Sequence, residues 1–422
     1  MKARTLTCLI VITVFAILAV PIRMAAQHAN YKLVDMGTLG GPASYLTEPG
    51  NGRGFLVLNS RGELAGKSDT PIPNNGSGNC PPICFDTKVF RWERNVLIPL
   101  DGLSTTIDNS DVGSINSRGW IAGNSATGDI DPITGGQIVH AVLWKENKAI
   151  DLGTLGSGLE SSAAYVNDGG EVVGVSTINT IPDPFSFLGG SIHPFIWKDG
   201  VMRDLGTLGT GTDAFTGSSC ANKSSGQVTG FSFIDYTDLG TLGGDFTITT
   251  WLNDAGEVVG GTTTAGEAEF HAALWRDGSI TDLGTLDGDC FSLAHAVNSS
   301  GQIVGESGSC FIALRAFLWD EGRIVDLNTL IPANSSLQLV VAANINDKGE
   351  IAGTGTPPGC ADYLECGHAF LLIPCAVDED CGSITRTSVV ETKSPFNAMT
   401  LTQRREMTKA FVARLRTRAA KR

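Results

Sequence analysis

The chain has 422 residues, of which 42% are hydrophobic, 7% aromatic and 18% charged, and its formal net charge is −14. This composition excludes an intrinsically disordered chain, because disorder requires few hydrophobic and aromatic residues. The 52 glycines indicate many short strands joined by tight turns, since glycine adopts the positive φ that such turns need.

The first 27 residues have the pattern of a secretory signal peptide. Lys2 and Arg4 precede an apolar run from Leu6 to Pro21, and small residues suited to cleavage follow it. We therefore expect residues 1–27 to be removed, and the mature protein to be secreted, periplasmic or on the cell surface. An uncleaved membrane anchor is the alternative, but the run of about 16 residues is shorter than the roughly 20 that span a bilayer.

Three short motifs recur in a fixed order. The first is DLGTLGG at 238–244, with close copies that begin at 35, 151, 204, 282 and 326. The second is an Asn followed by turn residues, Gly, apolar residues and Gly, at 58–66, 115–123, 166–174, 221–230, 252–260, 297–305 and 345–353. The third usually starts with His and ends with Trp, at 140–144, 193–197, 271–275 and 315–319, with variants at 89–92 and 368–372. Such recurrence indicates a repeat architecture.

The repeated unit predicts four short strands. Each Asn-x-x-Gly stretch lies between apolar runs and is typical of a hairpin turn, and Trp-Lys-Asp-Gly and its variants form a second turn. Four strands in a repeat of roughly 50 residues are typical of a β-propeller blade. We therefore predict an all-β fold, a β-propeller over residues 31–374, in which the Asn-x-x-Gly hairpin lies innermost and the DLGTL strand outermost.

The ends of the repeat region predict how the ring closes. Residues 31–39 resemble a fourth strand without its first three, and 338–373 resemble three strands without a fourth. We expect the N-terminal strand to pair with 368–373 and close a seven-bladed ring, which removes two open sheet edges. The repeat between Asn222 and Asp238 lacks the His-to-Trp strand, so this blade is predicted to be truncated. A six-bladed ring with one insertion is the alternative.

The three motifs together resemble the HAF repeat family of extracellular repeat proteins. The pieces that carry the resemblance are DLGTLGG, the N-D-x-G-x-V-V-G turn and the H-A-F-L-W strand, and they cover about residues 31–374. The resemblance implies secretion and a repeat fold. It implies no reaction and no catalytic residue.

Cysteine spacing predicts local disulfides, which suit an oxidising compartment. Cys290 and Cys310 belong to the two strands of one hairpin, and their equal distance from residue 300 places them opposite or nearly so. Nine cysteines remain after cleavage, so at least one stays without a partner in the chain, and Cys220 has no assigned partner. The expected pairs are Cys80 with Cys84, Cys290 with Cys310, Cys360 with Cys366, and Cys375 with Cys381, the last in a linker over 375–394.

The most conspicuous polar residues recur at fixed positions of the repeat, which indicates a structural role rather than a catalytic one. His140, His193, His271 and His368 share one repeat position and are expected to take part in the hydrogen bonding of their own blade, as is the repeated Asp at turn amides. The repeated Trp residues are expected to pack between blades. We assign no catalytic and no cofactor-binding residue. The loop at 128–136 places Asp129 and Asp131 where Ca²⁺ could bind through oxygen ligands, with an ordinary solvated turn as the alternative.

Non-repeating loops indicate where a partner binds. The connections between second and third strands are long at 67–88, 124–138, 177–192 and 354–367, and all emerge on one face. Insertions on one face mark the binding face of a repeat protein. The expected partner is an extracellular glycan or protein, and the expected function is a binding or structural module. The alternative is a propeller enzyme that acts on extracellular polysaccharide with carboxylates from this face.

Charge is unevenly distributed. Of the 30 Lys and Arg, three lie in the first 26 residues and eight lie after Pro395, whereas only one of the 44 Asp and Glu lies in that tail, so residues 27–394 carry a net charge of −24. Such a body repels phosphate backbones and excludes nucleic acid as a partner. The tail at 395–422 predicts a basic helix that contacts a membrane surface, docks on the acidic body or remains an appendix.

Overall fold

The computed structural model describes residues 31–46, 56–74, 84–105, 109–132, 135–181, 190–206, 215–221, 228–231, 239–309 and 312–375. The expectations for the signal peptide, for the basic tail and, beyond Cys375, for the linker lie outside these residues. In the described part of the chain, no helix combines the length and apolar character needed to cross a membrane.

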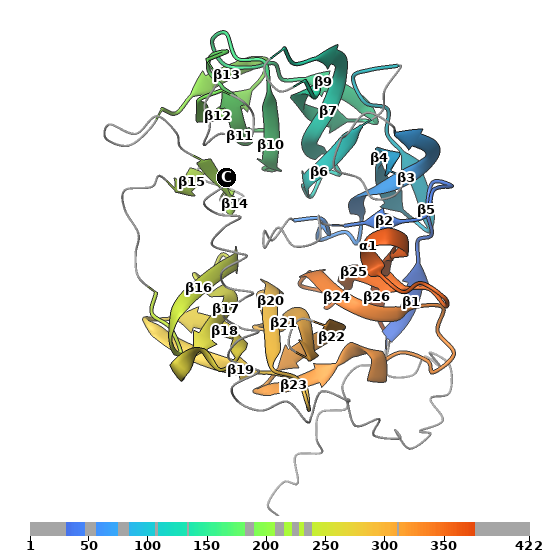
Figure 1. The fold of residues 1–422 in the computed structure, drawn as a ribbon, viewed down its shortest axis with the longest axis vertical. Helices are drawn as coiled ribbons and strands as arrows, with labels where there is room; N and C mark the ends of the chain where they lie inside the picture. The colour runs from blue at the N-terminus through green and yellow to red at the C-terminus, as the bar shows by residue number, and fades with distance from the viewer. Residues whose placement is uncertain are drawn as a thin grey trace, which may run out of the picture.

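The described strands form antiparallel sheets arranged around a common centre (Figure 1). The first sheet contains β2 (Ser44–Tyr45), β3 (Leu64–Asn74), β4 (Cys84–Glu93) and β5 (Val96–Pro99). The second contains β6 (Ser110–Ile115), β7 (Ile121–Ile130), β8 (Gln137–Lys145) and β9 (Lys148–Asp151). The third contains β10 (Ser161–Val166), β11 (Val172–Thr177), β12 (Ile192–Lys198) and β13 (Val201–Asp204). The fourth contains β14 (Phe215–Ala221) and β15 (Val228–Phe231).

The second half of the chain repeats this arrangement. The fifth group contains β16 (Gly243–Leu252), β17 (Val258–Thr264), the 3-10 helix η1 (Ala265–Glu267), β18 (Phe270–Arg276) and β19 (Ser279–Gly284). The sixth contains β20 (Phe291–Val297), β21 (Ile303–Ser309), β22 (Ile312–Asp320) and β23 (Arg323–Asp326), and the pair Phe270–Phe291 joins it to the fifth in one eight-stranded sheet. The seventh contains β24 (Gln338–Ile345), β25 (Ile351–Thr356), β26 (His368–Pro374) and β1 (Tyr31–Asp35), with η2 (Leu327–Thr329) before it and α1 (Tyr363–Cys366) between β25 and β26.

The strand order defines an inner edge and an outer edge of each four-stranded sheet. The first strand lies towards the centre and the fourth at the rim, as β10 and β13 show in Figure 1. This is the predicted order, with the Asn-x-x-Gly hairpin innermost. Because the strands are antiparallel, connections between second and third strands share one face, which we call the long-loop face. The Asn-x-x-Gly turns and the turns between third and fourth strands share the opposite face, which we call the turn face.

The N-terminal strand completes the seventh sheet. Residues Tyr31–Asp35 pair with Pro374–Phe370 in antiparallel register, and Tyr31 is 2% exposed. The strand was expected over 31–39, but it ends at Asp35 because Gly37 turns the chain with φ 64°. The Asp35 carboxylate accepts a hydrogen bond from the Gly37 N–H at 2.9 Å and stabilises that turn. The edge of β26 is thereby covered.

In two of the predicted long loops, the flanking strands extend further than expected. The segment 67–88 was expected to be a loop, but β3 and β4 continue to pair through Asp69–Thr87 and again at Pro73–Phe85. The segment 124–138 likewise continues the pairing of β7 and β8 as far as Ile130–Gln137. An irregularity in the register precedes the outer pair in each hairpin, so backbone hydrogen bonds extend each hairpin beyond its neighbours.

The repeated tryptophans of the second and third sheets pack between neighbouring sheets, as predicted. Trp144 of the second sheet is 1% exposed. It packs in one hydrophobic cluster with Val89 of the first sheet and with Leu100, which directly follows the last strand of that sheet. Trp197 packs with Leu143 in a cluster shared by the second and third sheets. Large apolar side chains are thus buried only when neighbouring repeats stack, which is why the motif must recur.

The asparagine of each turn links one repeat to the next. Its Oδ1 accepts backbone N–H groups within its own turn, while its Nδ2 donates to the backbone oxygen of the corresponding asparagine in the next sheet. The described links run from Asn59 to Asn116 (2.9 Å), Asn116 to Asn167 (2.9 Å), Asn253 to Asn298 (3.3 Å), Asn298 to Asn346 (3.2 Å) and Asn346 to Asn59 (3.1 Å). Residues 222–227, which contain the asparagine between the third and fifth sheets, lie outside the described chain.

Candidate functional site

The repeated histidines bond to the repeated aspartates, which confirms that they take part in the hydrogen bonding of their own sheet. In each case the imidazole Nδ1 of the third strand lies 2.9–3.0 Å from the carboxylate that begins the DLGTL motif of the adjacent strand. The pairs are His140–Asp151, His193–Asp204, His271–Asp282 and His368–Asp35. In the sixth sheet Arg315 replaces histidine and bonds to Asp326 at 3.0 Å.

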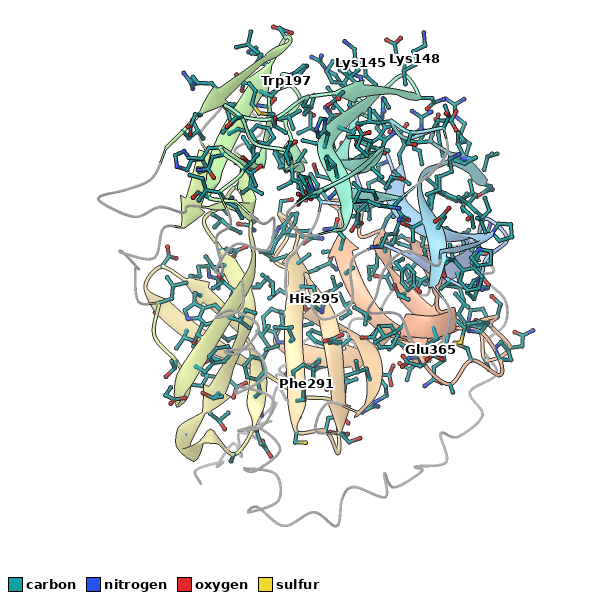
Figure 2. The ribbon with its side chains drawn as sticks, turned by 45° about the horizontal axis from the view of Figure 1, so that its top comes forward. Lys145, Lys148, Trp197, Phe291, His295 and Glu365 are labelled. Atoms are coloured by element: carbon teal, nitrogen blue, oxygen red, sulfur yellow. A yellow bond between two sulfur atoms is a disulfide. The ribbon has the colours of Figure 1, made fainter. Side chains whose placement is uncertain are left out.

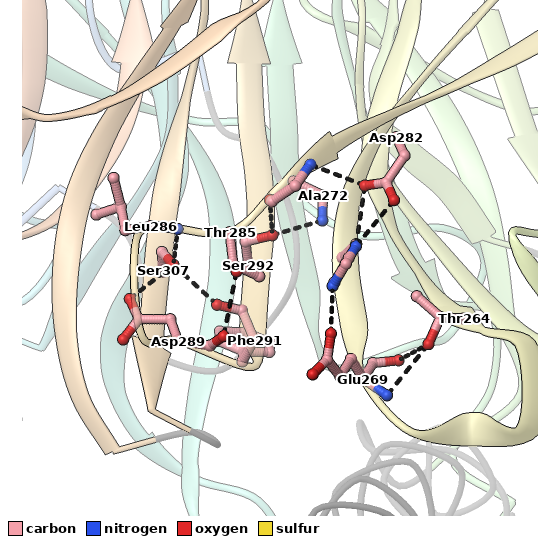
Figure 3. Close-up of polar contacts among 12 residues, drawn as sticks. Thr264, Glu269, Ala272, Asp282, Thr285, Leu286, Asp289, Phe291, Ser292 and Ser307 are labelled. Carbon is pink, nitrogen blue, oxygen red and sulfur yellow. Dashed lines mark hydrogen bonds and ion pairs between the residues drawn. The ribbon is translucent and has the colours of Figure 1, made fainter. Parts of the chain in front are cut away.

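His271 differs from the other three because a second carboxylate reaches it. Its Nδ1 lies 3.0 Å from Asp282 and its Nε2 lies 3.0 Å from Glu269, and Figure 3 shows both carboxylates with their neighbours. Burial disfavours the charged imidazole, but the two carboxylates outweigh burial and raise the His271 pKa above 6.5. Burial likewise works against ionised Asp282, but His271 and the Gly284 N–H outweigh it and lower the Asp282 pKa.

The rest of the DLGTL motif joins one sheet to the next. In the connection after β19, the Thr285 hydroxyl donates to Asp289 O at 3.2 Å, and the Leu286 N–H donates to the Ser307 hydroxyl at 3.0 Å (Figure 3). The Ser292 hydroxyl donates back to Gly284 O at 2.6 Å. The repeated residues of this motif therefore hold the sheets together. Candidate functional groups must be sought at positions where the repeats differ.

One such position follows the repeated glycine of the second strand. Its charged and amide occupants contact a first strand, either of their own sheet or of the next one. The residues at this position are Lys67, Asn124, Val175, Phe231, Gly261, Glu306 and Thr354. Lys67 forms an ion pair of 3.1 Å with Asp111 on the first strand of the next sheet. Glu306 lies 3.7 Å from His295, and each of these two side chains is 14% exposed. Figure 2 places His295 on β20, the inner strand of the sixth sheet.

The short helix α1 lies on the long-loop face, close enough to both charged pairs for their charges to act on the tyrosines at the helix. The Tyr45 hydroxyl donates to Leu364 O of α1 at 2.7 Å. Burial raises the Tyr45 pKa, and Asp69 adds to the shift, whereas Lys67 opposes it. Burial also raises the Tyr363 pKa, with Glu306 adding to the shift. We call this set the inner-strand cluster, and its members are Tyr45, Lys67, Asp111, His295, Glu306 and Tyr363.

The inner-strand cluster was not identified from the sequence. Its members come from three sheets and from α1, so spacing along the chain does not group them. The signal that could have found them is the departure from the repeat: Lys67 and Glu306 are charged where other repeats have Val175 or Gly261. The chemistry of the cluster is that of polar recognition, with phenols, an ammonium, an imidazole and carboxylates near one face.

Large apolar side chains are exposed near the tips of the long-loop face. They are Ile72, Ile130, Ile181 and Leu364, exposed by 58%, 58%, 68% and 44%. Each belongs to a different connection between second and third strands, in the first, second, third and seventh sheets. Val96 and Val201 on the turn face are also exposed, by 56% and 67%, so exposure alone does not distinguish the two faces.

The candidate calcium ligands do not lie together with a third ligand. Asp129 is exposed, whereas Asp131 is 1% exposed and its backbone N–H donates to Gly136 O. Among the described residues, no group of three or more His, Cys, Asp or Glu side chains is placed to hold a metal ion. Asp131 lies near Glu160 instead, and burial together with Asp131 raises the Glu160 pKa to about 7.

The cysteines are described only in part. Cys360 and Cys366 form a disulfide that closes the segment carrying α1. Cys290 and Cys375 are also disulfide-bonded, but their expected partners Cys310 and Cys381 lie outside the described residues, as does Cys80, the expected partner of Cys84. Within the hairpin, a bulge between Ala294 and Ala296 shifts the register so that Phe291 faces Gly308. The residue opposite Cys290 is therefore 309, one position short of the expected 310.

Comparisons with known proteins give no family. No family model matches the chain, and no curated protein matches it. Solved structures do show similarity at 12% sequence identity or less. One is a puromycin-hydrolysing peptidase of Mycobacterium tuberculosis, with a TM-score of 0.42, 12% identity and coverage of 81% of this chain and 55% of that one. This chain thus spans about half the length of the peptidase.

Two further structures cover most of both chains. A gluconolactonase of Xanthomonas campestris has a TM-score of 0.34 and 11% identity, with 83% of this chain and 93% of that chain covered. A lectin of Aleuria aurantia, solved with Fucα1-6GlcNAc, has a TM-score of 0.30 and 10% identity, with 83% and 98% covered. At these scores the similarities carry no argument about the function of this protein.

Proposed function

We propose that this protein is an exported, seven-bladed β-propeller that binds an extracellular glycan or protein on its long-loop face. The observation that carries the proposal is that repeated and non-repeating side chains have different roles and positions. Side chains that recur across the repeats are used in bonds within and between sheets, whereas the inner-strand cluster and the exposed side chains of Ile72, Ile130, Ile181 and Leu364 lie on the long-loop face. We also propose membership of the HAF repeat family, on the recurrence of its three motifs in order.

Two contacts support a closed ring of seven blades. The pairing of β1 with β26 brings the first described strand into the last sheet, and the Nδ2 of Asn346 donates to Asn59 O of the first sheet at 3.1 Å. An engineered pair Lys32→Cys with Ile373→Cys, whose Cα positions face each other, is expected to crosslink on oxidation. Failure of this pair to crosslink in the folded protein would argue against the closure.

Binding on the long-loop face can be tested with matched substitutions. Ile181 on this face is 68% exposed and Val201 on the turn face is 67% exposed, so each can be replaced by Ser without disturbing the core. The wild-type protein is first screened against arrayed glycans, cell-wall polymers and extracellular proteins. Ile181→Ser is then expected to weaken binding about fivefold, which is the effect of losing roughly 1 kcal/mol of apolar contact, whereas Val201→Ser is not.

The screen can also contradict the proposal. If Val201→Ser weakens binding as much as Ile181→Ser, the ligand does not select the long-loop face. If the wild-type protein binds nothing in the screen, the binding function itself is rejected. Both variants should keep the wild-type melting temperature, which separates a loss of contact from a loss of folding.

A polysaccharide-cleaving enzyme is the second candidate, and two perturbed carboxyl groups favour it. Burial raises the Asp69 pKa to about 6, and burial together with Asp131 raises the Glu160 pKa to about 7. Carboxyl groups with such pKa values are suited to proton transfer near neutral pH. The test is release of reducing ends or new unsaturated ends from extracellular polysaccharides. Activity that survives in both Asp69→Asn and Glu160→Gln would exclude these groups as catalytic.

A further inference from the structure

The second sheet breaks the repeat at one position of the turn face. In five of the described turns, the residue four positions after the asparagine is Glu or Gln, namely Glu63, Glu171, Glu257, Gln302 and Glu350. In the second sheet this residue is Trp120. Its backbone N–H still donates to Asn116 Oδ1 at 2.9 Å, so the turn is kept while the side chain has changed.

The substitution removes the partner of a lysine. In the third sheet Glu171 pairs with Lys198, the residue after the repeated Trp, at 3.0 Å. In the fifth sheet Glu257 pairs with Arg276 in the same way at 2.9 Å. In the second sheet the corresponding cation is Lys145, whose Nζ lies over the Trp120 ring, 4.3 Å from its centroid. The aromatic ring holds the ammonium in place without neutralising its charge.

Two more cations lie beside Lys145. The Arg118 guanidinium lies 5.2 Å from the centroid of the same Trp120 ring. Lys148 faces Lys145 across the two-residue turn between β8 and β9, and Figure 2 shows the two lysines next to each other at the edge of the molecule. Within the described chain, none of the three cations forms an ion pair. We call Arg118, Lys145 and Lys148 the basic patch.

The nearby carboxylates do not cancel the basic patch. Glu146 lies in the turn between the two lysines and is exposed. Asp168 accepts a hydrogen bond from the Ser117 N–H at 2.9 Å, which directs it to the backbone of the turn. Glu171 is held by Lys198. Two cations at one indole, with Lys148 opposite one of them, therefore stand out on a body with a net charge of −24.

We propose that Trp120 and the basic patch form a second binding site, on the turn face, for an acidic polysaccharide. An anionic group is required because the cations of the patch lack carboxylate partners. A narrow polymer fits better than a broad acidic surface. An anionic membrane or an acidic globular protein would bring many negative charges within a Debye length, about 8–10 Å, of the surrounding carboxylates. A polysaccharide chain contacts the patch alone and offers a carboxylate or sulfate on successive sugars.

The decisive variant is Trp120→Glu. This variant places at position 120 the glutamate that the corresponding turns of the third and fifth sheets carry. The new carboxylate should pair with Lys145 as Glu171 pairs with Lys198. The full-length mature protein is tested against polygalacturonate, with dextran as a neutral polymer, by affinity electrophoresis and calorimetry. We expect salt-sensitive binding of polygalacturonate by the wild type, and binding at least tenfold weaker in Trp120→Glu and in the double variant Arg118→Gln with Lys148→Gln.

The matched control is Lys198→Gln, which removes a lysine from the same position of the next sheet, where it is already paired. It should bind polygalacturonate as the wild type does. The proposal is overturned if the wild type does not bind polygalacturonate, if Trp120→Glu and the double variant bind unchanged, or if Lys198→Gln loses as much affinity as they do. Equal or tighter binding to polyglutamate or to phosphatidylserine vesicles would overturn the assigned class of ligand. Substitutions on the long-loop face should leave this binding unchanged, which separates the two sites.

Discussion

Replacing Trp144 with alanine tests whether packing between neighbouring sheets stabilises the fold. The side chain is 1% exposed and packs with Val89 and Leu100 from the preceding repeat, while its Nε1 donates to Asp101 O at 2.8 Å. Removal of a buried Trp side chain costs about 3–5 kcal/mol, and the lost hydrogen bond adds to this within the same range. We therefore expect Trp144→Ala to lower the free energy of unfolding by about 4 kcal/mol.

The size of the corresponding melting shift follows from the length of the folded region. For roughly 340 residues, the entropy of unfolding near the melting point is about 0.7 kcal/mol per kelvin, so a loss of 4 kcal/mol lowers Tm by about 6 °C. Calorimetry and urea unfolding measure this directly, with Val201→Ala as an exposed control that should change stability by less than about 0.5 kcal/mol. A loss below about 1 kcal/mol in Trp144→Ala would refute the argument that inter-sheet packing holds the repeats together.

Three further predictions concern pH, a disulfide and the tail. A histidine with a raised pKa contributes stability that is complete below its unfolded-state pKa, near 6.5, and is lost as pH rises through the folded-state pKa, so the wild type should lose stability as pH rises above 6.5. His271→Gln should flatten this loss in thermal melts, and an unchanged slope would contradict the contribution of its pairing with Asp282. Non-reducing peptide mapping should show Cys290 linked to Cys310, whereas free thiols at both positions would reject that pair. Deletion of residues 395–422 should leave Tm nearly unchanged, and a large drop would show that the tail is part of the core.

The sequence by itself determined the local structure of each repeat. A hairpin needs only a few adjacent residues, and the Asn-x-x-Gly turn contains its own stabilising contacts: the Asn116 side chain accepts N–H groups two and four residues along the chain. The scaffold role of the histidines was also predictable, because a residue that recurs at one position in each repeat serves what all repeats share. The all-β class and the strand order within each sheet followed from these local patterns.

Only the tertiary structure decided which side chains from different repeats meet. Lys67 and Asp111 are far apart along the chain, and their ion pair depends on the stacking of two sheets. The same holds for Lys145 and Trp120, because the repeat pattern predicts a carboxylate at position 120 and says nothing of a cation held over a ring. The extension of β3 and β4 was likewise hidden in the sequence, since continued pairing depends on backbone register across the hairpin rather than on residue type.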